Sequence, residues 1–194
     1  MIGKPMTTKL FILLALFCTC WIYSQDQDAK SYKTFISKKQ KLETRLKAAN
    51  DMGYLDDKQQ ARILDVFADE EEDEEIRVAA LYALRIADEM LDKVLEIYTA
   101  EGGKVLKKAC GDALQASFFT ESGLKKSDQI KAAYRKMITY SQPEVRNRAM
   151  QYLMVRGDDR AISVAAEALD GKSKLYSTNE AVSYCIMHGA QNHV

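Results

Sequence analysis

Residues that could bind a metal or act as a nucleophile gather near the end of the sequence. Cys185, His188 and His193 follow the spacing C-x2-H-x4-H, and residues three apart share one face of a helix. Thiolate and imidazole suit Zn²⁺, but a structural zinc site needs four ligands, and no second pair completes the set. The pattern therefore favours one histidine at a helix end and one in the tail, and we predict no metal site.

Catalytic motifs are equally sparse. Nucleophilic catalysis needs a base beside the nucleophile, and only the pair Cys185 and His188 could supply both. The phosphate-cradling patterns G-x-x-x-x-G-K-[ST] and G-x-G-x-x-G are absent, as is the E-x-x-H pattern of carboxylate-bridged metal centres. We therefore expect a protein that is not an enzyme, with no catalytic residues and no cofactor, and a thiol or metal enzyme using this pair is the rival hypothesis.

Charge is balanced over the chain but segregated along it. Of the 194 residues, 28 are Lys or Arg and 28 are Asp or Glu, so the net charge is zero. Residues 51–101 contain 16 acids and 5 bases, whereas residues 104–148 contain 10 bases and 4 acids. Residues 25–50 contain 7 bases and 3 acids. An acidic block thus lies between two basic blocks, and a folded chain would display them as separate patches.

A helix is predicted over residues 74–88. Apolar side chains recur there with the i, i+3, i+4 spacing of one helical face, at Ile76, Ala79, Ala80, Ala83, Leu84 and Ala87. Alanines allow neighbouring helix axes to approach to about 8–10 Å. This helix should be buried between others, and the seven acids before it (69–75) suit the positive end of its dipole.

The predicted helix recurs along the chain. Shifts of 30 and 69 residues align it with residues 106–114 and 145–153, and each copy has an apolar start, a basic residue, a small residue and a final leucine. The matching sets are Ile76, Arg77, Ala80 and Leu84; Leu106, Lys107, Cys110 and Leu114; and Val145, Arg146, Ala149 and Leu153. Further helices are predicted before each copy and after the last, over residues 59–68, 90–99, 127–140 and 159–169. The unit is a helix pair, repeated.

Several residues mark the boundaries of these helices. Ser141 with Glu144, and Ser177 with Glu180, have the spacing of a capping box. Gly157 before Asp158 indicates a helix end followed by a new start. The repeated Arg77 and Arg146 are predicted to pair with acids between repeats, such as Asp88 and Asp158.

The segments ADEEEDEEIRVAALYALRIAD and SQPEVRNRAMQYLMVRGDDRAI resemble HEAT repeats, especially the short type first associated with phycobilisome lyases. The matching residues are Ile76, Arg77, Ala80 and Leu84 in the first, and Val145, Arg146, Ala149, Leu153, Gly157, Asp158 and Asp159 in the second. The resemblance covers residues 56–170. It implies an all-α chain forming a right-handed α-α superhelix of three to four helix pairs, an architecture that mostly serves as a binding scaffold. The uneven shifts indicate that the middle repeat departs from a regular array.

Two of the four cysteines, Cys110 and Cys185, lie after residue 24. Cys110 occupies the small position of its copy, and Cys185 lies about two repeats away, near 20 Å at usual helix spacing. Because a disulfide needs Cα atoms within about 7 Å, we predict buried, unbridged thiols.

The first residues have the pattern of a secretory signal peptide. Lys4 and Lys9 precede an uncharged run over residues 10–24, LFILLALFCTCWIYS. Its strongly apolar part is about 14 residues, shorter than the roughly 20 of a membrane-spanning helix. We expect cleavage after Ser24 and an exported, periplasmic or envelope-associated protein, and the alternative is a lipoprotein anchored at Cys20. The expected organisation is a signal peptide (1–24), N-terminal capping helices (25–55) and a HEAT-like repeat domain (56–194).

The charge blocks suggest the function. We expect an exported scaffold that binds another protein through a charge-segregated surface comprising Glu71, Glu72, Glu74, Lys104, Lys107, Lys108, Lys131 and Arg135. The alternative is an envelope module that binds an anionic lipid or glycan through the basic block. Export argues against nucleic acid as a partner, and the sequence does not set the partner's identity or the oligomeric state.

Overall fold

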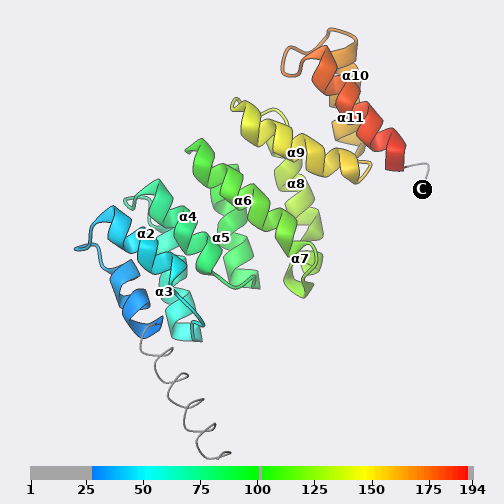
Figure 1. The fold of residues 1–194 in the computed structure, drawn as a ribbon. Helices are drawn as coiled ribbons and strands as arrows, with labels where there is room; N and C mark the ends of the chain where they lie inside the picture. Colours follow the sequence, from blue (N-terminus) through cyan, green and yellow to red (C-terminus); the bar gives the residue numbers. More distant parts are fainter. Residues whose placement is uncertain (1–27, 101, 192–194) are drawn as a thin grey trace, which may run out of the picture.

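The computed structural model describes residues 28–100 and 102–191, which are helices joined by turns and short loops (Figure 1). A first helix covers residues 28–36. The helices that follow are α2 (Leu42–Asn50), α3 (Asp57–Ala68), α4 (Glu74–Ala83), α5 (Asp88–Thr99), α6 (Lys104–Ser117), α7 (Glu121–Lys125), α8 (Ser127–Met137), α9 (Pro143–Val155), α10 (Asp159–Leu169) and α11 (Thr178–Gln191). No strand occurs in these ranges, so the predicted all-α class is confirmed. The predicted signal peptide, with Cys20 and Ser24, lies outside the described residues.

The helices form two layers. In the front layer of Figure 1, α2, α4, α6, α9 and α11 pack each on the next, while α3, α5, α8 and α10 lie behind them. Each back-layer helix also packs against the front-layer helix that follows it in sequence. Four such pairs follow residue 56 in the described chain, as the repeats predict. The handedness of the stack stays a prediction.

One continuous hydrophobic core joins all the pairs. It runs from Phe35 in the first helix to Tyr184 in α11 and includes the three small residues of the repeats, Ala80, Cys110 and Ala149, each 0% exposed. The repeat leucines Leu114 and Leu153 are also buried. The capping helices therefore share their core with the repeats, because Phe35 and Ala48 belong to the same cluster.

Helix α4 is shorter than predicted. It ends at Ala83, and residues 84–87 leave the helix before α5 begins at Asp88. Contacts from α3 hold this segment, since the Arg85 backbone N–H donates to the Gln60 side chain at 3.0 Å and the Arg85 guanidinium pairs with Asp57 at 2.6 Å. Ala87 is consequently exposed rather than buried. Tertiary contacts override the helical pattern here.

The predicted helix boundaries are confirmed at two sites and wrong at a third. Glu180 and Ser177 form a capping box at α11, and Gly157 (φ 62°) precedes Asp158, whose carboxylate caps α10. Ser141 makes no cap, because Pro143 takes the first helical position of α9 and residue 142 becomes the N-cap.

Three tyrosines, from α5, α8 and α9, pack against one another in the core. Tyr134 packs edge-on against Tyr98, with centroids 5.5 Å apart, and is stacked on Tyr152 at 3.8 Å. The Tyr134 hydroxyl donates to the Gly111 carbonyl at 2.6 Å. The Tyr98 hydroxyl is buried without a hydrogen-bond partner. Tyr98 and Tyr134 are both buried, but of these two hydroxyls only that of Tyr134 makes a hydrogen bond among the described residues.

Matched Tyr→Phe substitutions should separate the two roles. Tyr134→Phe removes a buried hydrogen bond and is expected to lower the free energy of unfolding by about 1 kcal/mol, whereas Tyr98→Phe removes an unsatisfied polar group and should leave it unchanged or raise it. Urea denaturation of both variants measures the difference. Equal losses would contradict the assignment.

Candidate protein-binding surface

The basic residue that recurs in the repeats binds the end of the preceding helix. In three front-layer helices its side chain donates to a carbonyl ten residues earlier: Arg45 Nε to Phe35 at 2.7 Å, Arg77 Nε to Phe67 at 3.0 Å and Lys107 Nζ to Ile97 at 3.5 Å. In α9, Arg146 donates to the carbonyls of Tyr140 and Ser141 at 3.1 and 3.4 Å. Carbonyls at a helix C-terminus lack intrahelical donors. These bases therefore tie α2, α4 and α6 to the end of the helix before each of them, and α9 to the loop that follows α8.

The predicted pairing of Arg77 and Arg146 with Asp88 and Asp158 is therefore wrong. Asp158 pairs instead with two bases of α8, and a hydrogen bond from Ser122 holds the pKa of Asp88 below its ordinary value. The nearest acceptors for the repeat arginines are backbone carbonyls, and their positions depend on how the helices pack.

Lys107 is part of the interior rather than of a partner surface. It is 1% exposed, and its ammonium group donates to the carbonyls of Tyr98 and Ala100 as well as Ile97. The ammonium also lies 4.8 Å from the centroid of the Tyr140 ring. These contacts anchor the C-terminal end of α5 and place Lys107 beyond the reach of a docking partner.

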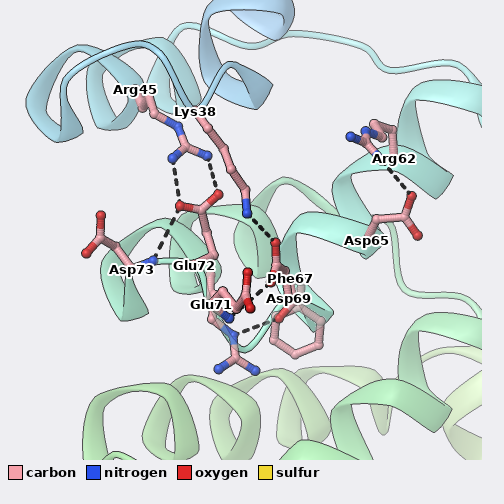
Figure 2. Close-up of polar contacts among 10 residues, drawn as sticks. Lys38, Arg45, Arg62, Asp65, Phe67, Asp69, Glu71, Glu72 and Asp73 are labelled. Carbon is pink, nitrogen blue, oxygen red and sulfur yellow. Dashed lines mark hydrogen bonds and ion pairs between the residues drawn. The ribbon is translucent and has the colours of Figure 1, made fainter.

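The seven consecutive acids form the turn before α4 and the first two residues of that helix, and this segment, residues 69–75, is named the acidic turn below. Figure 2 shows two ion pairs that fasten it to the N-terminal helices. Arg45 binds Glu72 through two parallel bonds of 2.7 Å, and both side chains are nearly buried, at 4% and 6% exposed. Lys38 pairs with Asp69 at 2.7 Å. Hydrogen bonds from Arg45 and Lys38 hold the pKa values of Glu72 and Asp69, respectively, below their usual values.

Glu74 connects the acidic turn to the next pair. Its Oε1 accepts a hydrogen bond of 2.9 Å from the backbone N–H of Leu106, in the first turn of α6. The N-cap residue of α6 is Gly103, which has no side chain to do this. Glu74 therefore caps a neighbouring helix, and it has a structural role like that of Glu72.

Four carboxylates of the acidic turn remain available to a partner. They are exposed and make no ion pair or hydrogen bond within residues 28–100 and 102–191. These four, named the free carboxylates below, are Glu70, Glu71, Asp73 and Glu75. Of the acids predicted for the surface, only Glu71 belongs to them.

The basic block, by contrast, is largely engaged within the chain. Nine of its ten bases make an ion pair or hydrogen bond: Lys104 with Glu144, Lys107 with carbonyls, Lys125 with Glu121, Lys126 with Asp92, Lys131 and Arg135 with Asp158, Lys136 with the Thr99 carbonyl, Arg146 with carbonyls, and Arg148 with Asp112. Lys108 is exposed and makes no such contact among the described residues.

The bases predicted for the partner surface are also divided between the two helix layers. Lys104 and Lys108 lie on α6 in the front layer, whereas Lys131 and Arg135 lie on α8 in the back layer.

Asp158 organises the bases of α8. Its side chain is 0% exposed and lies 2.9 Å from the Arg135 guanidinium and 3.2 Å from the Lys131 ammonium. The carboxylate also accepts from the backbone N–H groups of Arg160 and Ala161. Burial alone would raise the pKa of Asp158, but the hydrogen bonds from Arg135, Lys131 and Ala161 outweigh it and lower the pKa.

A groove of about 510 Å³ lies between α2 and α4. Partly buried aliphatic side chains line it: Leu46, Ala49, Met52, Val78, Ala79 and Ala83. Tyr82, 66% exposed, lies at its wall, and Glu75 is the charged residue that lines it in the described chain. Ala79 and Ala83, predicted to lie on the buried face of the 74–88 helix, are partly buried against the core and also line this groove.

The thiols and histidines form no ligand cluster in the part of the chain that is described. Cys110 and Cys185 are unbridged, as predicted, and Cys110 is buried with its pKa raised to about 12 by desolvation. Cys185 is half-buried rather than buried. Among the described residues no group of three or more His, Cys, Asp or Glu side chains is placed to hold a metal. The side chain of His188 and all of His193 lie outside that description.

Comparison with protein-family models, with curated proteins and with solved structures gave no match to this chain. The HEAT-like assignment thus stays a prediction from the residues quoted above. None of the described helices is both long enough and apolar enough to cross a membrane.

Three residues of the candidate surface and its support were not predicted from the sequence. Arg45 repeats Arg77 at a shift of 32 residues, but polar Thr44 replaces the apolar residue that begins the other copies. Glu75 and Tyr82 lie on α4 at the groove, and only the packing of α2 against α4 distinguishes them from solvated positions.

Proposed function

We propose that this protein is an exported scaffold that binds another protein, and that the acidic turn is the centre of its binding surface. The observation that carries the proposal is the difference between the two charge blocks. Nine of ten bases of the basic block are engaged within the chain, whereas four acids of the turn are exposed and have no ion pair with any residue that the structure describes.

A basic protein segment is the partner that this surface favours. Clustered carboxylates raise the rate of encounter with a cationic partner and disfavour anionic ones. Glu72 forms a buried ion pair with Arg45, and Glu74 caps α6. These two contacts hold the backbone of the acidic turn in place, so the free carboxylates are already positioned before a partner binds. Preorganisation of this kind reduces the entropy lost on binding.

The alternative, binding of an anionic lipid or glycan through the basic block, has less support. Of that block, Lys108 alone is exposed without an ion pair or hydrogen bond in the described ranges. An anionic ligand would have to compete with carboxylates such as Glu144, Asp112 and Asp158 for the other bases.

Affinity capture by charge-reversal variants tests the proposal. The full chain, tagged at its C-terminus, is expressed in the cells that normally make it, beside the triple variant Glu70→Lys, Glu71→Lys and Asp73→Lys. Recovery of the captured partner is expected to fall about tenfold or more in the triple variant and to fall with added salt, because the contact is electrostatic. Intact mass of the captured chain tests export, with an N-terminus at Gln25 expected after cleavage and a lipidated Cys20 as the alternative.

The matched control is Lys108→Glu, which changes an exposed, unpaired charge on α6. It should leave recovery unchanged. An unchanged partner set in the triple variant, or a loss confined to Lys108→Glu, would contradict the proposal, and the second result would favour an anionic ligand.

A further inference from the structure

The groove between α2 and α4 adjoins the acidic turn, because Glu75 belongs to both. Its volume of about 510 Å³ lies within the range of about 300–1,000 Å³ typical of ligand sites. Apolar side chains such as Leu46 and Val78, only partly covered by the chain itself, form the part of the lining called the aliphatic floor below, and the polar residue Asn50 also lines the groove. Burial of an apolar side chain on this floor would be favourable at about 25 cal/mol per Å² of apolar surface removed from water.

The charge at the groove selects among apolar partners. Glu75 is exposed, and Glu71 is exposed in the turn before α4; neither makes an ion pair in the described chain. A base in the partner would therefore meet uncompensated carboxylates, whereas an acid there would be repelled.

Tyr82 provides a third element of recognition. It is 66% exposed at the groove wall, and its hydroxyl makes no hydrogen bond within the residues described. Tyrosine supplies a large apolar surface together with a hydroxyl donor, and it is enriched among residues that dominate binding energy in interfaces.

We infer that this groove takes a segment of the partner protein that places an apolar side chain on the aliphatic floor and a lysine or arginine beside Glu75. The inference rests on the proposed function and specifies the partner's chemistry. Binding requires both burial of the partner's apolar side chain in the groove and a charge pair between its base and Glu75. A segment that has only one of these two features should not bind.

Three fluorescein-labelled peptides test this chemistry by fluorescence anisotropy with the full chain. They alternate lysine with leucine, glutamate with leucine, and lysine with serine over seven residues. The lysine–leucine peptide is expected to bind at least about tenfold more tightly than either of the others. Equal binding of the glutamate–leucine or lysine–serine peptide would overturn the inference.

Variants locate the site. Glu75→Lys, Tyr82→Ala and Ala79→Trp should each weaken the lysine–leucine peptide about tenfold or more, while Glu167→Lys on α10 and Ala116→Trp on α6 should not. Tyr82→Ala alters an exposed side chain, so it remains informative if Ala79→Trp fails to fold. Affinities insensitive to all three groove variants would overturn the inference. Self-association that disappears in Tyr82→Ala would also overturn it, because a second copy would then occupy the groove.

The failure of this inference is distinguishable from failure of the proposed function. If the triple variant of the acidic turn loses the captured partner while Tyr82→Ala and Glu75→Lys retain it, the scaffold function stands and the groove is excluded. If none of these variants changes capture, both fail.

Discussion

Replacing Glu72 with alanine is expected to lower the free energy of unfolding by about 3–5 kcal/mol, the cost of removing one partner of a buried ion pair. The Arg45 guanidinium is 4% exposed and bound to Glu72 by two bonds of 2.7 Å. Without Glu72 its charge stays buried and keeps its contacts with the carbonyl and the ring of Phe35, neither of which is an anion. The substitution should also release α2 from the acidic turn, and urea denaturation at neutral pH measures the loss.

The same pair gives stability a defined pH dependence. Arg45 lowers the pKa of Glu72 in the folded state, so the pair stabilises the fold above the unfolded-state pKa, about 4.3. That contribution disappears as the pH falls through the folded-state value. The Glu72→Ala variant should therefore lose less stability than the wild type between neutral and strongly acidic pH.

Glu71→Ala is the matched control, because it removes a neighbouring carboxylate that is exposed and unpaired in the described chain. It should change the free energy of unfolding by no more than about 0.5 kcal/mol. Similar losses in the two variants would show that Glu72 is not held in the buried pair. A double-mutant cycle with Arg45→Leu should give strong coupling with Glu72 and none with Glu71.

Replacing Asp158 with alanine is expected to lower the free energy of unfolding by about 2–4 kcal/mol. The carboxylate caps α10, a contact worth about 1 kcal/mol, and receives charge-assisted hydrogen bonds from Arg135, worth about 1.5–3 kcal/mol. The loss should be smaller than for Glu72, because Arg135 and Lys131 are 44% and 42% exposed and regain water. Asp158 also has a lowered pKa, so its contribution should fade as the pH drops below about 4.

Asp159→Ala provides the comparison for Asp158. Asp159 is exposed in the first turn of α10, where a negative charge contributes about 0.3–1 kcal/mol through the helix dipole. A loss in Asp159→Ala equal to that in Asp158→Ala would mean that charge near the helix start, rather than the buried network, accounts for the effect.

Local patterns predicted the elements of this fold, but packing decided the roles of its charged residues. The α10 helix, Asp159–Leu169, has the predicted bounds, because Gly157, Asp158 and the apolar spacing are local signals. Glu71 and Glu72 are adjacent and chemically identical, yet only Glu72 meets Arg45. Nothing in the sequence distinguishes them, since the choice depends on where α2 lies.

The repeated bases illustrate the same limit. The spacing of Arg77, Lys107 and Arg146 predicted equivalent structural positions, and Arg77 and Lys107 do bind carbonyls ten residues earlier, whereas Arg146 binds the Tyr140 carbonyl six residues earlier. Their acceptors are backbone carbonyls, which every residue carries, so sequence could not identify them. The end of α4 at Ala83 likewise could not be predicted from the sequence, because tertiary contacts from Gln60 and Asp57 stabilise the non-helical segment that follows.

Photo-crosslinking from the position of Tyr82 tests the central claim most directly, that a partner protein docks beside the acidic turn at the α2–α4 groove. Benzoylphenylalanine is placed at Tyr82 and, as control, at Ala116 on α6, and cells making each full chain are irradiated. We expect a covalent adduct from position 82 and none from position 116, and the crosslinked partner segment should contain an apolar residue next to lysine or arginine. An adduct from position 116 with none from position 82, or attachment to an acidic segment, would contradict it.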